Sequence, residues 1–355
     1  METSESYWVY VSSRTYPDEV GGIGIFERNP QKGALKALEL STAAHTSNYT
    51  TVDREKGILY SATLDALHAL KIDRNTGKLT LINKTALSGT GGSFISLSHD
   101  KKFLLVSHFA TGSVVSRRLN RDGSIGEIVS KIDHEGSSVN PDRQEGPHAH
   151  MALQAPDSQL VFVPDLGIDK VMIYQISDSG VLTPGPIPFI NMQPGDGPRH
   201  VVFHPNNRFV YVLAELSNFV EAYEFDPQKG PTKKIARIKT IPSDFNEFSK
   251  SAAIRISQDG NFLYSSNRGH NSIATFKINQ TTGELSLVDI LPTQGEYPRD
   301  FSLDPTGDYI LIGNRHSGTI SIQNIDSKTG TFEPVDLLEA YDSPVCITFV
   351  KRSTG

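Results

Sequence analysis

The sequence has almost no cysteine and no long hydrophobic run. Cys346 is the only cysteine among 355 residues, which excludes an intramolecular disulfide framework and suits a reducing compartment. No run of about 18 apolar residues occurs. The amino terminus, METSESYWVYVSS, also lacks a basic segment followed by an apolar core. We therefore expect a soluble, cytoplasmic protein with no membrane partner.

The sequence also lacks an excess of positive charge. Its formal net charge is −6 and the charges are interspersed, which argues against nucleic acid as a partner. There is no Gly-x-Ser-x-Gly nucleophile elbow, no phosphate loop ending in Gly-Lys-Ser/Thr, and no dinucleotide fingerprint. These absences predict no cofactor and leave direct attack by water as the simplest chemistry.

What the sequence does contain is a repeat of about 50 residues built from strands and turns. The chain has 29 glycines and 20 prolines between short runs of Val, Ile, Tyr and Phe, a composition typical of β-structure. A turn that contains glycine and follows Asn or Asp recurs seven times, at Gly33, Gly77, Gly123, Gly180, Gly230, Gly283 and Gly330.

A second turn marker recurs six times rather than seven, each time before an apolar strand. It lies at Arg54, His99, Pro156, Pro205, Gln258 and Pro305. The two ends of the chain supply the missing unit, because CITFV near the carboxyl end is an opening strand and YWVYVSS near the amino end is a second strand. We therefore predict an all-β fold: a single seven-bladed β-propeller of four-stranded blades over residues 1–355, closed by pairing the terminal strands in one split blade. An open β-solenoid would need capping repeats.

Propeller geometry brings equivalent strand ends to one mouth of the central channel. In the stretch Gly197–Asp226, for example, Arg199, His200 and Glu215 lie at strand ends. The positions six residues before each marker are Asn48, Ser93, His150, Arg199, Ala252 and Arg299, with Val345 as their counterpart in the split blade. The positions ten residues after each marker are Leu64, Phe109, Leu166, Glu215, Arg268 and Arg315, with Arg14 as their counterpart. Together they form this ring.

Several arginines in the ring of a net acidic protein indicate an anion site. Their charges repel one another unless an anion offsets them, and the planar guanidinium suits a phosphate or carboxylate. His150 is the natural general base of the set, since imidazole titrates near neutral pH. Taken one at a time, an arginine at a strand end is more often a solvated surface charge. His150 is equally consistent with a buried histidine bonded to backbone.

The segment GSSVNPDRQEGPHAH (136–150) adds length before His150. The spacing is 45 residues from Asn48 to Ser93 but 57 from Ser93 to His150. This loop is expected to cover the channel and to contribute Arg143, Gln144 or His148. His148 and His150 alone are weak evidence for a metal, because zinc needs a third ligand that the sequence does not identify. We predict no metal.

Four strings resemble the lactonase family of seven-bladed propellers: GDGPRHVVFHPNNRFVYVLAEL, RQEGPHAH, SNRGHNSIATFKI and YPRDFSLDPTGDYILIGN. The resemblance covers essentially the whole chain. It implies an active-site cluster of His150, Arg199, Glu215 and Arg268 at the channel mouth, without a metal. The substrate-binding residues predicted around this cluster are Arg143, His148, His200, Asn267 and Arg299. Bacterial lactonases often differ just before His150, which leaves the role of His148 open.

The resemblance implies hydrolysis of 6-phospho-D-glucono-1,5-lactone to 6-phosphogluconate, a step of the pentose phosphate pathway. The predicted partner is a small anionic lactone. Arg199, Arg268 and Arg299 would share phosphate binding and oxyanion stabilisation, while His150 activates water and Glu215 orients it or holds an arginine. Two alternatives stay open: cyclisation of a carboxy-cis,cis-muconate, as in fungal members of the family, and a non-catalytic propeller that binds proteins. The oligomeric state is not predicted.

Overall fold

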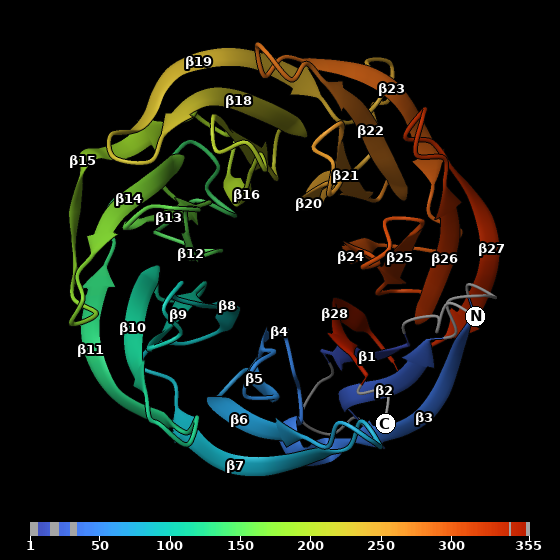
Figure 1. Ribbon diagram of the computed structural model, residues 1–355. Coiled ribbons are helices and arrows are strands. Elements are labelled where there is room, and N and C mark those ends of the chain that lie inside the picture. Colours follow the sequence, from blue (N-terminus) through green and yellow to red (C-terminus); the bar gives the residue numbers. More distant parts are fainter. Residues whose placement is uncertain (1–5, 15–20, 29–33, 341, 353–355) are drawn as a thin grey trace.

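Seven antiparallel sheets of four strands each are arranged around a central channel (Figure 1). The computed structural model describes residues 6–14, 21–28, 34–340 and 342–352. The sole helical segment in these ranges is the short 3-10 turn η1 (Thr42–Ala44). None of the described residues form a helix of the length and apolarity needed to cross a membrane. The predicted all-β, seven-bladed propeller is confirmed.

Six blades are continuous in sequence, and each runs from its innermost to its outermost strand in chain order. Their strands are β4 (Tyr49–Asp53), β5 (Ile58–Ala62), β6 (Ala66–Ile72) and β7 (Leu79–Ala86); β8 (Gly92–Leu97), β9 (Phe103–His108), β10 (Ser113–Leu119) and β11 (Ile125–Asp133); β12 (Leu153–Gln154), β13 (Leu160–Asp165), β14 (Lys170–Ile176) and β15 (Leu182–Asn191); β16 (Pro198–Phe203), β17 (Phe209–Ala214), β18 (Phe219–Asp226) and β19 (Gly230–Lys239); β20 (Lys250–Ile256), β21 (Phe262–Arg268), β22 (Ser272–Ile278) and β23 (Leu285–Pro292); β24 (Pro298–Leu303), β25 (Tyr309–Asn314), β26 (Thr319–Ile325) and β27 (Phe332–Glu339).

The seventh blade is split between the two ends of the chain. Its innermost strand is β28 (Pro344–Lys351), and β1 (Tyr7–Ser13), β2 (Gly22–Arg28) and β3 (Leu35–Ser41) complete it. Strands β28 and β1 pair antiparallel in the register that places Tyr7 opposite Lys351. The predicted closure is therefore confirmed, and it leaves no unpaired innermost strand.

The repeated glycine turn joins the third and fourth strands of a blade and docks on the preceding blade. At Gly283, φ is +74° and an added Cβ would lie 2.5 Å from the Phe209 ring, so only glycine fits without strain. The carbonyl of Gly283 accepts a hydrogen bond from the Tyr211 hydroxyl at 3.1 Å. Gly77 and Gly123 accept the same bond from tyrosines of their preceding blades. The first copy of this turn, at Gly33, lies outside the described residues.

The hydrophobic core lies between the blades rather than at the centre of the ring. Each apolar cluster joins strands of neighbouring blades, as in the edge-to-face contacts of Phe162 with Phe203 and Phe225. Leu311 and Ile320 of the last blade likewise pack on Phe349 of the split blade. Burying side chains of this size contributes on the order of 2 kcal/mol each, so every interface helps to hold the ring closed.

Bulges near the mouth interrupt the innermost strands at the ring positions. In β16, Pro198 pairs with Ala214 and His200 with Leu213, which leaves Arg199 without a partner in the ladder. Arg299 in β24 and Ser93 in β8 occupy the same position. A bulge redirects a side chain and increases the local twist, which explains how these strand ends present residues to the channel.

Candidate active site

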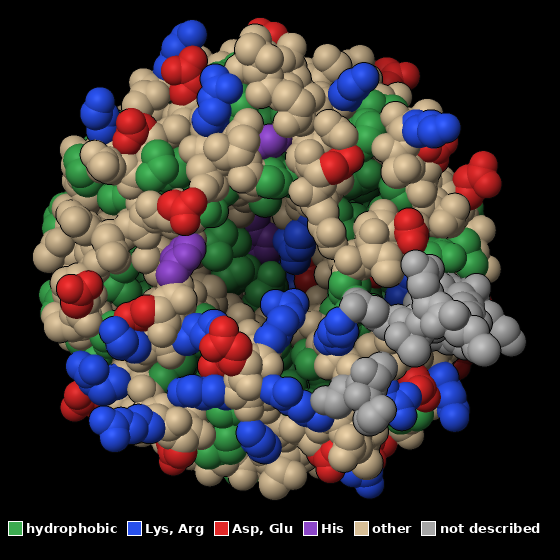
Figure 2. All heavy atoms as spheres, in the orientation of Figure 1, with side chains coloured by type: hydrophobic (Ala, Val, Ile, Leu, Met, Phe, Trp, Pro, Cys, Tyr) green, Lys and Arg blue, Asp and Glu red, His purple; other side chains and the backbone are tan. Residues whose placement is uncertain are grey.

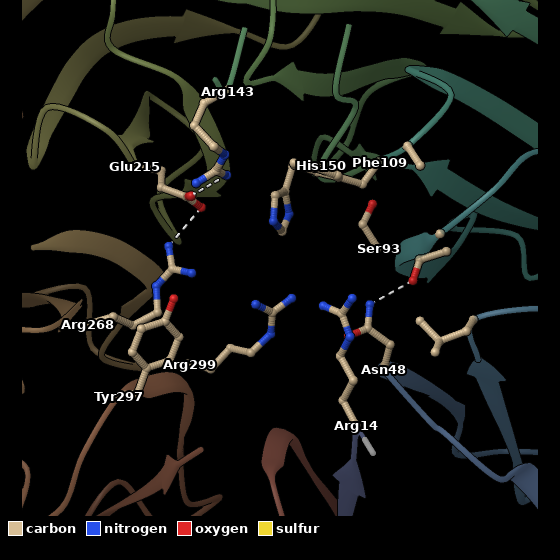
Figure 3. A pocket seen from close by; sticks show the side chains of 14 residues that line it. Arg14, Asn48, Ser93, Phe109, Arg143, His150, Glu215, Arg268, Tyr297 and Arg299 are labelled. Carbon is tan, nitrogen blue, oxygen red and sulfur yellow. Dashed lines mark hydrogen bonds and ion pairs between the residues drawn. The ribbon is translucent and has the colours of Figure 1, made fainter. Parts of the chain in front are cut away.

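The channel opens on one face into a cavity of about 270 Å³. Figure 2 shows this face hollowed at its centre, with Lys and Arg side chains around the opening. The residues that line the cavity come from several blades: Arg14, Asn48, Leu64, Gly91, Gly92, Ser93, Phe109, Ala110, Arg143, His150, Glu215, Arg268, Tyr297 and Arg299 (Figure 3). Four arginines and one glutamate are its charged members, so the lining carries net positive charge.

Glu215 is the buried centre of an ion-pair cluster. Its Oε1 accepts a hydrogen bond from Arg143 Nη2 at 2.9 Å. Its Oε2 lies 2.8 Å from Arg268 Nη2 and 3.1 Å from Arg199 Nε. The chain after β17 places this carboxylate where β16, β21 and the loop 136–150 converge, so a single side chain holds three guanidinium groups. Figure 3 shows two of them, those of Arg143 and Arg268.

The charges around Glu215 keep it ionised. Burial by itself raises the pKa of this carboxyl, but Arg268, Arg199 and Arg143 lower it, and the net result is a pKa far below its ordinary value. A carboxylate this acidic is a poor general base near neutral pH. Its contribution is to hold the arginines in place and to offset part of their charge.

His150 projects its ring into the cavity from the end of the loop 136–150 (Figure 3). Its side chain is 4% exposed, and its Nδ1 is buried without a hydrogen-bond partner among the described residues. Burial, followed by the charge of Arg199, lowers the pKa of His150 well below 6.5, although Glu215 opposes this. The imidazole is therefore neutral at neutral pH, the state in which one ring nitrogen can accept a proton.

Arg268 forms a fixed wall of the cavity together with Tyr297. The Arg268 guanidinium donates hydrogen bonds to the carbonyls of Ser251 at 2.9 Å and Lys250 at 3.2 Å, and lies 5.3 Å from the centre of the Tyr297 ring. Because these contacts use donors on one side, they orient the group toward Glu215 and the cavity.

Tyr297 is a lining residue that the prediction from sequence missed. Its φ is +63°, a left-handed conformation that is strained for an aromatic residue. The signal was present in the repeat, because Tyr-Pro-Arg at 297–299 corresponds to Gly-Pro-Arg at 197–199, and Gly197 has φ +60°. A tyrosine at a position that elsewhere takes glycine points to a role for its ring.

Buried carboxylates anchor the loop 136–150. Asp165 Oδ1 accepts hydrogen bonds from the backbone amides of His148 at 2.6 Å and Gly167 at 3.0 Å, while its Oδ2 lies 2.6 Å from His134 Nδ1. Asp169 Oδ2 accepts a hydrogen bond from the Ser138 hydroxyl. The predicted covering loop is thus a fixed part of the site.

Several residues of the predicted site lie outside the cavity lining. Arg199 is buried against Glu215, donates to the Ala252 carbonyl and lies 3.1 Å from Nε2 of the buried His200. The His148 ring stacks on Phe109, with its nitrogens 2.9 Å from the Phe109 carbonyl oxygen and 3.1 Å from Glu145 Oε1. These residues surround and support the lining.

The side-chain amides of Asn267 and Gln144, both predicted near the site, form hydrogen bonds within the protein. The fully buried Asn267 donates to the Thr240 carbonyl at 2.7 Å and accepts from the Ser251 hydroxyl at 3.0 Å, so its placement gives no contact with the cavity. Gln144 donates to the Leu166 carbonyl at 2.9 Å. A neighbour of Arg268 in sequence is therefore turned away from it in space, as expected for successive residues in a strand.

The lining offers no side chain prepared for covalent attack. The Ser93 hydroxyl donates to a backbone carbonyl, that of Ala149 at 2.9 Å, and lies 2.9 Å from the Ser107 hydroxyl. Cys346 does not line the cavity, and burial raises the pKa of its thiol to about 12. Over the described ranges, His148 and His150 find no third metal-ligating side chain, and no such group of three occurs elsewhere in them.

These features define a class of protein: a seven-bladed β-propeller whose channel mouth is an arginine-rich cavity with a neutral histidine and an ionised glutamate. The sequence model described as "Lactonase, 7-bladed beta-propeller" matches residues 8–349. The chain therefore belongs to the lactonase family of seven-bladed β-propellers, which confirms the resemblance seen in the motifs.

Individual relatives match over nearly their whole length. The chain is 35% identical over 335 residues to the 6-phosphogluconolactonase of Bacillus subtilis, covering 93% of this chain and 95% of that one. Among solved structures, the Pseudomonas aeruginosa periplasmic gluconolactonase superimposes with a TM-score of 0.92 at 27% identity, over 98% and 100% of the two chains. A putative 6-phosphogluconolactonase from Bacteroides fragilis gives 0.91 at 26% identity, over 99% of each.

Proposed function

We propose that this protein is a lactonase that hydrolyses the ester of 6-phospho-D-glucono-1,5-lactone by direct attack of water. The observation that carries the proposal is the juxtaposition, in one cavity, of the neutral His150 with arginines held by Glu215. The relatives named as 6-phosphogluconolactonase and gluconolactonase support a lactone as the substrate.

In the proposed mechanism, His150 takes a proton from the water that attacks the ester carbonyl. It returns the proton to the ring oxygen when the tetrahedral intermediate collapses and the bond between the carbonyl carbon and that oxygen breaks. The negative charge that develops on the carbonyl oxygen is stabilised by Arg268 and Arg143, the two cavity arginines that Glu215 orients. Arg199 does not line the cavity, so we assign it to positioning Glu215 rather than to contact with the oxyanion. Because these groups are already in place, little reorganisation accompanies the reaction.

His150→Ala is expected to lower kcat for this lactone by about 10²- to 10⁴-fold, the usual contribution of a general base. The assay uses freshly prepared 6-phosphogluconolactone, with spontaneous hydrolysis subtracted, in the presence and absence of a chelator. We expect hydrolysis that the chelator does not change. A carboxymuconate is tested in parallel, because the arginines would also suit carboxylates. Turnover of the muconate alone would replace the lactonase proposal with a cycloisomerase, and turnover of neither would favour a binding protein.

The pH dependence of kcat/KM provides a second test of the role of His150. The base must be neutral, and its pKa lies well below 6.5. Activity should therefore persist as the pH falls from 7.5 through 6.5, instead of halving there as it would with an ordinary histidine. An inflection at pH 6.5 that disappears in His150→Ala would contradict the buried, neutral imidazole.

A role in the pentose phosphate pathway and a cytoplasmic location complete the proposal. A free, buried Cys346 is consistent with a reducing compartment. The relative from P. aeruginosa is described as periplasmic, so the fold does not determine the location. Fractionation of the native cells tests the cytoplasmic location.

A further inference from the structure

Arg299 differs from the arginines around Glu215 because no described carboxylate lies against it. Arg143, Arg199 and Arg268 all lie within 3.1 Å of a Glu215 oxygen. Arg255, deeper in the channel, lies 2.7 Å from Asp300 Oδ1. For the guanidinium of Arg299, by contrast, the described part of the chain supplies neither a hydrogen-bond acceptor nor a carboxylate.

The position of Arg299 directs it into the cavity. It is the bulged residue of β24, and its guanidinium points to the middle of the cavity beside that of Arg14 (Figure 3). Glu215 lies on the other side, already enclosed by its own arginines. The cavity is therefore polarised: Glu215 offsets part of the positive charge on one wall, whereas on the other wall no described carboxylate pairs with Arg299.

The surroundings of Arg299 make this charge costly when the cavity is empty of anions. Burial, followed by the charges of Arg199, Arg14 and Arg268, lowers the pKa of Arg299 well below its ordinary value. An anion placed against Arg299 would offset this repulsion, whereas an anion placed against Glu215 itself would also meet the negative charge of that carboxylate.

We propose that Arg299, together with Arg14, forms the subsite that binds the phosphate group of a phosphorylated lactone. This inference rests on the proposed function and assigns an orientation to its substrate. Phosphate is the only charged group of such a lactone, and at neutral pH it carries a charge of about −1.5 to −2, which the unpaired guanidinium of Arg299 would offset in part. With the phosphate at Arg299, the ester carbonyl lies toward His150 and Arg268.

Steady-state kinetics with two lactones test this assignment. Arg299→Gln is expected to raise KM for 6-phosphogluconolactone by about 30- to 100-fold with kcat changed less than about threefold, since a charge-assisted hydrogen-bonding partner of the phosphate is lost. The kinetic constants for unphosphorylated glucono-1,5-lactone should not change. Equal effects on both lactones would overturn the phosphate subsite. Arg299→Lys, which keeps the charge, should restore part of the affinity.

Arg315→Gln is the matched control. Arg315 follows β25 in the same blade and occupies an equivalent ring position, but it does not line the cavity. It should leave KM for both lactones within about threefold of the starting protein. Arg299→Gln removes a repelled charge, so its melting temperature should equal or exceed that of the unsubstituted protein; the comparison excludes misfolding as the cause of a raised KM.

Calorimetric titration with inorganic phosphate separates this inference from the proposed reaction. We expect phosphate to bind and Arg299→Gln to weaken it by at least about tenfold, a difference that stands even if no lactone is hydrolysed. Equal phosphate affinity in both proteins would overturn the subsite even if hydrolysis is observed. Tighter binding of a muconate-type dicarboxylate than of phosphate would also overturn it, in favour of a carboxylate ligand.

Discussion

Glu215→Gln should lower the free energy of unfolding by about 3–5 kcal/mol, the usual cost of removing one partner from a buried charge cluster. The carboxylate contacts three guanidinium groups through its two oxygens. Glutamine keeps the shape but loses the charge, and its amide nitrogen would present hydrogens to a guanidinium. Turnover of the lactone should fall by about 10³-fold, because Arg143 and Arg268 lose the group that orients them. Urea unfolding and initial rates measure the two effects.

Two further variants make the Glu215 result specific. Glu145→Gln alters a carboxylate of the loop 136–150 that is 59% exposed, so stability should change by less than about 0.5 kcal/mol. Adding Arg143→Gln to Glu215→Gln removes one of the uncompensated charges and should recover part of the lost stability without recovering turnover. Unchanged stability of Glu215→Gln would contradict the prediction. It would mean that the three guanidinium groups do not repel one another measurably when the carboxylate is removed.

Acidification from pH 7 to pH 5 should destabilise the protein steeply, because burial keeps four histidines neutral in the folded state. Burial lowers the pKa of His68 and of His108 to about 4, and lowers those of His150 and His200 well below 6.5. In the unfolded chain each histidine titrates near 6.5. The unfolded state therefore binds more protons, and stability is lost as the pH falls from about 6.5 toward 4. Four groups together give a slope of up to about 5 kcal/mol per pH unit.

Urea unfolding at pH 7.0, 6.0 and 5.0 measures this slope, in a range where most carboxylates stay ionised. His68→Gln is the informative variant, since it removes one titrating group outside the proposed site, and it should reduce the slope by about 1.4 kcal/mol per pH unit. The buried Nδ1 of His68 has no hydrogen-bond partner among the described residues. The substitution therefore breaks no hydrogen bond at this atom. An unfolding free energy that does not change between pH 7 and pH 5 would contradict the prediction.

The fold could be predicted from the sequence because its determinants are local and repeated. Short apolar strands such as β17 follow turns at regular intervals. The glycine turns recur because each must adopt a positive φ against the preceding blade. The incomplete units at the two termini match in only one way, through pairing of β1 with β28. Counting these signals therefore determined the number of blades and the closure.

The same counting brought together most of the cavity. It placed His150, Glu215, Arg268 and Arg299 on one mouth, and in the structure all four line the cavity. It could not distinguish Arg299 from Arg199, because both are bulge residues at equivalent positions of β24 and β16.

Strand period and turn chemistry act over a few residues at a time, so the sequence is sufficient to predict the ring and the set of residues that reach its mouth. The tertiary structure alone decided which of them face a ligand. Arg199 is buried against Glu215, whereas no carboxylate of the described residues pairs with Arg299. The physical reason is that the direction and charge balance of each side chain depend on partners from other blades, and those partners meet only once the ring has closed.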